Sequence, residues 1–158
     1  MKIEEELQVR KFSSDWQRAT VDILFTASWL GLILEKRASK KGITLQQFNV
    51  LRILRGQLPR PSTNNLVRSR MIGNTPDISR LIDRIVTKGL VSRTKNKDDK
   101  RAVDLFITQK GLDLLQSIED DMMLADLLPK HISAKEAALL SELLDKLRGE
   151  EHVEKQTY

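Results

Sequence analysis

Apolar residues recur at helical spacing in the first part of the chain. Between residues 14 and 38 they are separated by three or four positions, and charged residues lie off this stripe. Ser13 or Ser14 can cap the start of such a helix, and Gly42 follows its basic end. The pattern predicts one long helix with a broad apolar face. That face consists of Trp16, Ala19, Ile23, Ala27, Leu30 and Leu34.

Two shorter helices are expected to follow. Thr44 can cap the first, which stops before the Gly- and Pro-containing segment GQLPRPS. Its inner face consists of Phe48, Leu51 and Leu54. Ser62 or Thr63 can cap the second, whose sequence is NNLVRSRM. This second helix places Leu66, Val67 and Met71 inside and leaves Arg68 and Arg70 facing solvent.

A fourth helix is predicted over residues 76 to 88. Thr75 can cap it, and Pro76 has the fixed backbone angle that suits a first helical position. Lys88 and Gly89 end it. Its apolar stripe is Ile78, Leu81, Ile82 and Ile85. The residues left on the outer face are Asp77, Ser79, Arg80, Asp83 and Arg84.

After Gly89 the pattern changes from helical to strand-like. The segments LVSRT and AVDLFIT are rich in β-branched residues, and the charged segment KNKDDKR separates them. They predict a β-hairpin with a long polar tip. Two more helices are expected, one capped by Thr108 and one after Pro129. Their apolar positions are Leu112, Leu115, Ile118 and Met122 in the first, and Leu140, Leu143, Leu144 and Leu147 in the second.

Composition excludes several kinds of chemistry. The chain has no Cys, so disulfides, thiolate metal sites and cysteine-based redox sensing are ruled out. His131 and His152 are too few and too far apart for a metal site, and we expect no structural zinc. No nucleophilic triad or acid and base pair can be assembled from the sequence. We therefore expect no catalytic residue, no cofactor and no enzymatic activity.

The length and hydropathy of the chain suit a single domain without membrane contact. A domain commonly takes about 100 to 200 residues, and this chain has 158. No apolar run approaches the roughly 18 residues of a membrane span. The start MKIEEELQVR is acidic, unlike a secretory leader. We expect a cytoplasmic protein.

Positive charge is concentrated in the middle of the sequence. Residues 52 to 110 contain fourteen Lys and Arg against five Asp, a net charge of +9, whereas the rest of the chain carries −4. A charge run is more often a solubilising face than a binding site. Here the separation by sign favours a surface that binds a polyanion, because Lys and Arg displace the counterions condensed on nucleic acid.

The order helix, turn, helix and β-hairpin defines a winged helix-turn-helix, in a fold that is otherwise mainly α. A major groove of DNA admits one helix, whose first residues meet the base edges. In the helix at residues 76 to 88, Arg80 and Arg84 can bind guanine or phosphate, while Asp77 and Ser79 can read or exclude neighbouring bases. The hairpin tip can reach the flanking minor groove, and Arg101 is the candidate there. The predicted DNA-binding set is Thr75, Asp77, Ser79, Arg80, Arg84, Arg68, Arg70, Lys95, Lys97, Asp99, Lys100 and Arg101.

The sequence also resembles the MarR family of bacterial winged-helix transcriptional regulators. The resemblance covers most of the chain and is strongest from about Leu45 to Leu115. It lies in LQQFNVLRIL, TPDISRLIDRIVTKGLVSR, DDKRAVDLFIT and the KG that follows. The resemblance implies an obligate dimer with interleaved first and last helices, which binds a palindrome and usually represses transcription. It also implies that an acidic-x-Arg element at the wing tip, here Asp99 and Arg101, positions the Arg for the minor groove.

Each candidate also has an ordinary structural interpretation. Arg80 can be a surface cation paired with Asp77 or Asp83, and such a pair contributes only about 0.2 to 0.5 kcal/mol. Asp99 and Arg101 can stiffen a loop, which is compatible with insertion into a groove. Arg68 and Arg70 can contact phosphates or only water. The Trp residues and leucine stripes are expected in a dimer core rather than in a ligand pocket.

These observations together predict a single domain over residues 1–158. Residues from about 44 to 110 form a winged-helix DNA-binding lobe, and residues from about 8 to 40 and from 110 to 148 form dimerisation helices. The expected function is that of a homodimeric regulator, a repressor on a palindromic operator in double-stranded DNA. Family resemblance adds a small-molecule effector in a crevice between the two parts. The rival interpretation is a winged-helix module for protein association, which would not need the +9 segment.

Overall fold

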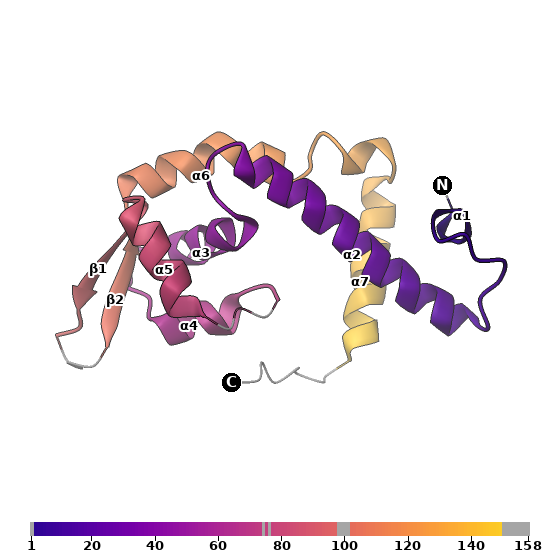
Figure 1. Cartoon of the computed structure of the whole chain (residues 1–158), viewed down its shortest axis with the longest axis horizontal. Helices are drawn as coiled ribbons and strands as arrows, with labels where there is room; N and C mark the ends of the chain where they lie inside the picture. The colour runs from indigo at the N-terminus through magenta and orange to yellow at the C-terminus, as the bar shows by residue number, and fades with distance from the viewer. Residues whose placement is uncertain (1, 74, 76, 98–101, 150–158) are drawn as a thin grey trace.

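The computed structural model describes residues 2–73, 75, 77–97 and 102–149 (Figure 1). It is mainly helical and contains one two-stranded antiparallel sheet, as the sequence predicts. In chain order the elements are α1 (Ile3–Glu6), α2 (Asp15–Ser39), α3 (Leu45–Arg55), α4 (Asn64–Arg70), α5 (Ile78–Thr87), β1 (Val91–Lys95), β2 (Val103–Ile107), α6 (Gln109–Met122), the short 3-10 helix η1 (Leu128–Lys130) and α7 (Ala134–Arg148). Helices α1 and η1 are not predicted by the sequence pattern.

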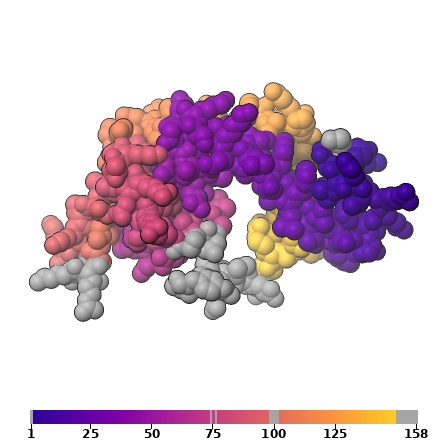
Figure 2. Space-filling view, in the orientation of Figure 1, coloured from indigo at the N-terminus to yellow at the C-terminus, as the bar shows by residue number. Residues whose placement is uncertain are grey.

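The elements form two groups, one at each end of the molecule, and long helices join them. In Figure 1, α3, α4, α5 and the β-hairpin gather at one end, which we call the lobe. Helix α7 and the N-terminal half of α2 lie at the other end, which we call the arm, and α1 lies beside the arm. Helices α2 and α6 connect the two ends, so the space-filling outline is an arch (Figure 2). No helix in the described part of the chain is long and apolar enough to span a membrane.

Side-chain caps fix where most helices begin. Ser14 accepts a hydrogen bond from the backbone N–H of Gln17 at 3.2 Å and starts α2, which decides between the two serines. Thr63 caps α4, because Ser62 instead pairs its backbone with Leu105 of β2. The predicted caps at α3 and α6 are confirmed. They are Thr44 and Thr108.

The core lies in the lobe and continues under α6. The predicted stripe of α5 is confirmed, since its four apolar side chains are all 8% exposed or less. They pack in one cluster with the inner faces of α3 and α6 and with the hairpin. The largest side chains of this cluster with under 2% exposure include Leu51, Leu54, Ile78, Ile85, Leu105, Leu115 and Ile118.

The hairpin is anchored to this core by one end. Val91 pairs with Ile107, and Lys95 pairs with Val103 at the far end of the ladder. Leu105 and Ile107 are buried, whereas Val103 on the same side is 38% exposed. The hairpin therefore extends beyond the core toward its tip.

Two ion pairs fasten α3 and α2 to α6 and to the segment after it. Arg55 of α3 binds Glu119 of α6 through two hydrogen bonds, of 2.7 and 3.2 Å. Arg37 of α2 binds Asp126 in the same forked manner, at 2.7 and 2.8 Å. These hydrogen bonds hold the pKa of each carboxyl below its ordinary value, so both pairs are charged at neutral pH.

Gly111 permits the close approach of α6 to the hairpin. A Cβ at this position would collide with the backbone oxygen of Leu90 and would lie 2.7 Å from Cγ1 of Ile107. Both obstacles belong to buried residues. No side chain larger than hydrogen fits there without displacing α6.

We predict that Gly111→Ala lowers the free energy of unfolding by about 1 to 3 kcal/mol, because overpacking forces backbone shifts. Chemical denaturation at fixed protein concentration measures this change. Gly31→Ala in α2 is the matched control, since a Cβ there meets nothing within 4 Å. The control should be unchanged or more stable by up to about 1 kcal/mol. Equal stabilities of the two variants would contradict the packing argument.

Candidate nucleic-acid interface

Helix α5 begins two residues later than the sequence predicts. The N-cap is Asp77, whose carboxylate accepts a hydrogen bond from the backbone N–H of Arg80 at 3.0 Å. The prediction that Thr75 caps a helix starting at Pro76 is therefore wrong. Asp77 caps as well as Thr does, and its negative charge also suits the positive end of the helix dipole. Pro76 itself lies outside the described residues.

Thr75 is turned into the protein. It is 8% exposed, and its hydroxyl has no hydrogen-bond partner in the described part of the chain. The structure thus separates Thr75 from the other predicted contact residues of this segment, which face solvent.

The outer face of α5 is polar and exposed, as predicted. Ser79, Arg80, Asp83 and Arg84 are all exposed, while the apolar stripe is buried on the opposite face. The Arg80 side chain is 81% exposed and pairs with Asp77, with 3.1 Å between Nε and Oδ2. Arg84 forms no ion pair among the residues that the structure describes. Two guanidinium groups about one helical turn apart therefore face solvent on the same element.

An ion pair joins α5 to the wing. The guanidinium of Arg93, on β1, donates to the carboxylate of Asp83, on α5. From the sequence, Asp83 is an outer-face residue of the helix and a possible partner of Arg80, and nothing marks Arg93 as its partner. Helical spacing could not have revealed this contact, because it depends on how β1 packs beside α5. The pair ties the base of the wing to the exposed face of α5.

Helix α4 lies across the N-terminal end of α5. The side-chain amide of Asn64 donates to the Ser79 hydroxyl at 3.4 Å, which connects the starts of the two helices. Arg70 is exposed and Arg68 is half-buried. In Figure 1, α4, α5 and the wing all lie at the end of the molecule that is remote from the arm.

The described part of the wing presents two cations where its ladder ends. Lys95 ends β1, and Lys97 follows it; both are exposed. Asn96 holds the base of the tip through its backbone N–H, which donates to the Ala102 oxygen at 3.1 Å. Its side-chain amide donates to Asp104 at 2.9 Å. The predicted contact residues Asp99, Lys100 and Arg101 lie outside the described residues.

The basic segment does not place all of its cations on this surface. Arg55 is bound to Glu119 of α6. Lys88 donates to the backbone oxygen of Gly42, and Lys110 donates to that of Lys88 at 2.8 Å. The net charge of residues 52 to 110 therefore overstates the positive charge available to a ligand of α4, α5 and the wing.

Within the described ranges, no group of three or more His, Cys, Asp or Glu side chains is placed to hold a metal ion. What this surface offers is guanidinium, ammonium, hydroxyl and carboxylate groups on a helix beside a β-hairpin. Such groups can bind phosphates and base edges.

Comparisons with known proteins identify the family. A model of the MarR family matches residues 41–102. The MarR transcription factor from Planctomyces limnophilus is 32% identical, with 85% of this chain and 98% of that chain covered and a TM-score of 0.66. A mutant of MarR from E. coli, solved in complex with operator DNA, is 29% identical, with 79% and 89% covered and a TM-score of 0.68. No curated protein matches the chain significantly.

The fold is shared more widely. The organohalide-sensing transcriptional regulator RdhR-CbdbA1625, in its form bound to 2,4-dichlorophenol, is 21% identical, with 92% and 89% covered and a TM-score of 0.74. The chain belongs to the MarR family of winged-helix transcriptional regulators. The matched relatives are transcription regulators, and the absence of enzymatic activity in this chain stays a prediction.

We predict that Asp77→Ala lowers the free energy of unfolding by about 0.5 to 2 kcal/mol, because it removes the cap of α5. Asp77→Asn should change the free energy of unfolding little, since Asn caps a helix equally well. Thr75→Val is the control: its hydroxyl has no hydrogen-bond partner in the described residues, so the loss should be small. Thermal or urea unfolding distinguishes the variants. A larger loss in the free energy of unfolding for Thr75→Val than for Asp77→Ala would indicate that Thr75, and not Asp77, caps α5.

Proposed function

We propose that this protein is a homodimeric repressor that binds a palindromic operator sequence-specifically and is relieved by a small-molecule effector. The observation that carries the proposal is the division of α5 into a buried apolar face and an exposed face with Arg80 and Arg84. The complex of its E. coli relative with operator DNA supports it. As a regulator of transcription, the protein would act in the cytoplasm.

In this proposal α5 enters the major groove of DNA. Arg80 and Arg84 bind guanine or phosphate, and Asp77 and Ser79 discriminate neighbouring bases. Arg80 must leave Asp77 to do so. The exchange costs little, because an exposed ion pair contributes about 1 kcal/mol or less. We do not include Thr75 among the base contacts, because its side chain is buried.

The flanking elements bind the DNA backbone. In this proposal Arg68 and Arg70 of α4, and Lys95 and Lys97 of the wing, neutralise phosphates on either side of α5. The proposal extends to Asp99, Lys100 and Arg101 on the strength of the family resemblance of this segment. In it, Arg101 enters the minor groove and Asp99 holds it in position.

The Asp83–Arg93 pair has a role in this arrangement. DNA recognition needs α5 and the wing in the two grooves simultaneously, so their relative position affects both contacts. The ion pair restrains that position from outside the hydrophobic core. We therefore assign Asp83 and Arg93 a positioning role.

Exposed apolar residues of the arm support a dimer. In the single chain, α7 contains no buried residue, and Leu139, Leu140, Leu143 and Leu147 are 50% to 63% exposed. Trp16 at the start of α2 is 83% exposed. Apolar side chains in such number favour burial by a partner. A second copy would cover them and give two α5 helices for the two halves of a palindrome.

We predict that Arg80→Ala weakens binding to the specific operator by about 1 to 3 kcal/mol and relaxes preference at one base position. Lys97→Ala should weaken binding to specific and random duplexes alike, because a phosphate contact carries no sequence information. Fluorescence anisotropy with both duplexes measures the effects. Equal losses on the two duplexes for Arg80→Ala would contradict a base contact.

The salt dependence of the same titrations separates the proposal from a protein-association module. Binding through several phosphates should fall steeply as salt increases from low to physiological concentration, because each contact releases counterions. A flat dependence would favour the rival function.

We predict that Leu143→Glu converts the dimer to a monomer, because it places a charge in the apolar surface of α7. Sedimentation velocity over a range of concentrations measures the change. Ile72→Glu is the control, since Ile72 is 72% exposed but lies in the turn after α4, away from the arm. A wild-type protein that sediments as a monomer at micromolar concentration would contradict the dimer.

A further inference from the structure

Two polar side chains meet where α4 and α5 begin. Asn64 is the first residue of α4, and Ser79 is the second residue of α5. The amide nitrogen of Asn64 donates to the hydroxyl oxygen of Ser79 at 3.4 Å. Asn64 is half-buried and Ser79 is exposed. The contact therefore connects a side chain on the exposed face of α5 to a neighbouring helix.

A serine hydroxyl alone does not distinguish bases by the polarity of their hydrogen-bonding groups. It has one O–H donor and two lone pairs, so it can donate to a base acceptor or accept from a base donor. Which of the two it does depends on what else the hydroxyl binds.

The fold leaves the hydrogen of the Ser79 hydroxyl unused. Hydroxyls further along a helix can donate to a carbonyl of the preceding turn, as Ser117 does to Leu114 at 2.8 Å and Ser141 does to Ala137 at 3.0 Å. Ser79 lies in the first turn of α5, so no earlier turn of that helix can accept its hydrogen. Within the described part of the chain, the only hydrogen-bond partner of this hydroxyl is the amide of Asn64.

The Asn64 amide directs the hydroxyl outward as a donor. Its N–H occupies one lone pair of the Ser79 oxygen, and a hydroxyl that accepts one hydrogen bond becomes a stronger donor of another. We propose that Asn64 is a positioning residue that makes Ser79 a hydrogen-bond donor in the major groove, so that guanine is favoured over cytosine at one position of each half-site. Guanine presents acceptors in that groove, whereas the polar group of cytosine there is a donor.

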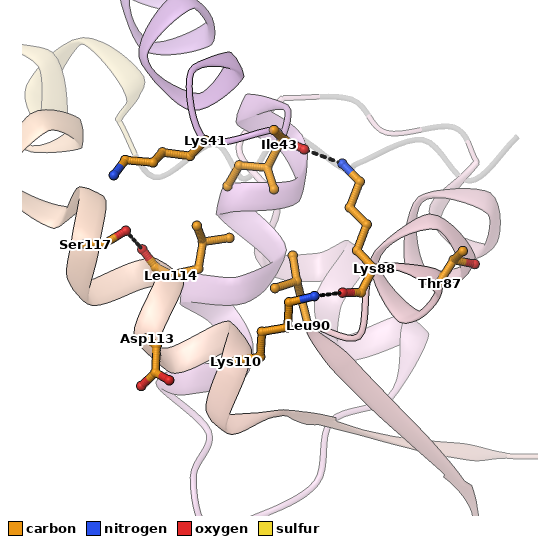
Figure 3. A pocket seen from close by; sticks show the side chains of 10 residues that line it. Lys41, Ile43, Thr87, Lys88, Leu90, Lys110, Asp113, Leu114 and Ser117 are labelled. Atoms are coloured by element: carbon orange, nitrogen blue, oxygen red, sulfur yellow. Dashed lines mark hydrogen bonds between the residues drawn. The ribbon is translucent and has the colours of Figure 1, made fainter.

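Selection by polarity requires a hydroxyl that stays in place, and α5 is held at both ends. At its start, the Asp77 carboxylate accepts from the backbone N–H of Arg80 at 3.0 Å. At its end, Lys88 donates to the oxygen of Gly42, and the oxygen of Lys88 accepts from Lys110 at 2.8 Å (Figure 3). The buried apolar stripe fixes the rotation of the helix between these ends.

The decisive variant is Asn64→Asp. A carboxylate only accepts hydrogen bonds, so it takes the hydrogen of the Ser79 hydroxyl and leaves only lone pairs toward the base. Cytosine should then be favoured at this position and guanine disfavoured. Asn65→Asp is the matched control, because it adds the same charge to the first turn of α4. Asn65 is exposed and has no hydrogen-bond partner among the residues that the structure describes.

The measurement starts from the operator recovered by selection from a random DNA pool. Fluorescence anisotropy gives the affinity for this operator and for duplexes with each other base pair at every half-site position in turn. We expect the wild type to favour guanine over cytosine about three- to tenfold at one position, and Asn64→Asp to reverse this preference by a similar factor.

Three further variants complete the experiment. Asn64→Ala should flatten the preference, because the hydroxyl is then free to donate or accept, and Ser79→Ala should abolish it. Asn64→Asp added to Ser79→Ala should change no base preference further. Asn65→Asp should weaken binding to all duplexes alike and keep the preference of the wild type. Thermal unfolding shows whether each variant is folded.

The inference rests on the proposed function, and the two can fail separately. An operator that Asn64→Asp binds with unaltered base preference would overturn the role of Asn64 and leave the proposed function intact. The same holds if Asn65→Asp shifts the preference equally, or if Ser79→Ala keeps it. A wild-type protein that binds no DNA sequence preferentially would refute the proposed function and the inference together.

Discussion

The buried contact between α5 and the core of the lobe is the constraint on which the rest of the structure depends. Four apolar side chains of a ten-residue helix are buried in one cluster with side chains of α3, α4, α6 and the hairpin. Because the helix has only one other face, this burial determines which residues meet solvent. The orientation of Arg80 and Arg84 is thus set by Ile78, Leu81, Ile82 and Ile85. The Asp83–Arg93 pair between α5 and the wing adds a restraint from outside this core.

Much of the fold could be predicted because its signals are local. Periodicity identified the apolar faces of α2 through α6, and Ser14, Thr44, Thr63 and Thr108 cap helices where polar side chains precede apolar repeats. The start of α5 was misjudged because Thr75 and Asp77 are both good caps and Pro76 favours the earlier one. Burial of Thr75 decides between them, and burial depends on the tertiary fold.

The candidate site could be predicted only in part. The outward residues of α5 follow from its own period. The Asp83–Arg93 pair, the Arg55–Glu119 pair and the lysines bound to backbone oxygens join segments distant in sequence. These contacts show why a charge count is a weak guide to a binding surface: several cations of the basic segment stabilise the lobe internally. For the leucines of α7 the helical pattern is clear from the sequence. The single chain nevertheless buries none of them, so the pattern alone does not show what covers this face.

Selection of bound fragments from a random DNA pool tests the central claim most directly, because it requires both the exposed face of α5 and the symmetry of two copies. The account predicts enrichment of an inverted repeat whose half-site centres lie about one helical turn, roughly 10 base pairs, apart on the duplex. Recovery of a lone half-site, or of no common sequence at all, would contradict it.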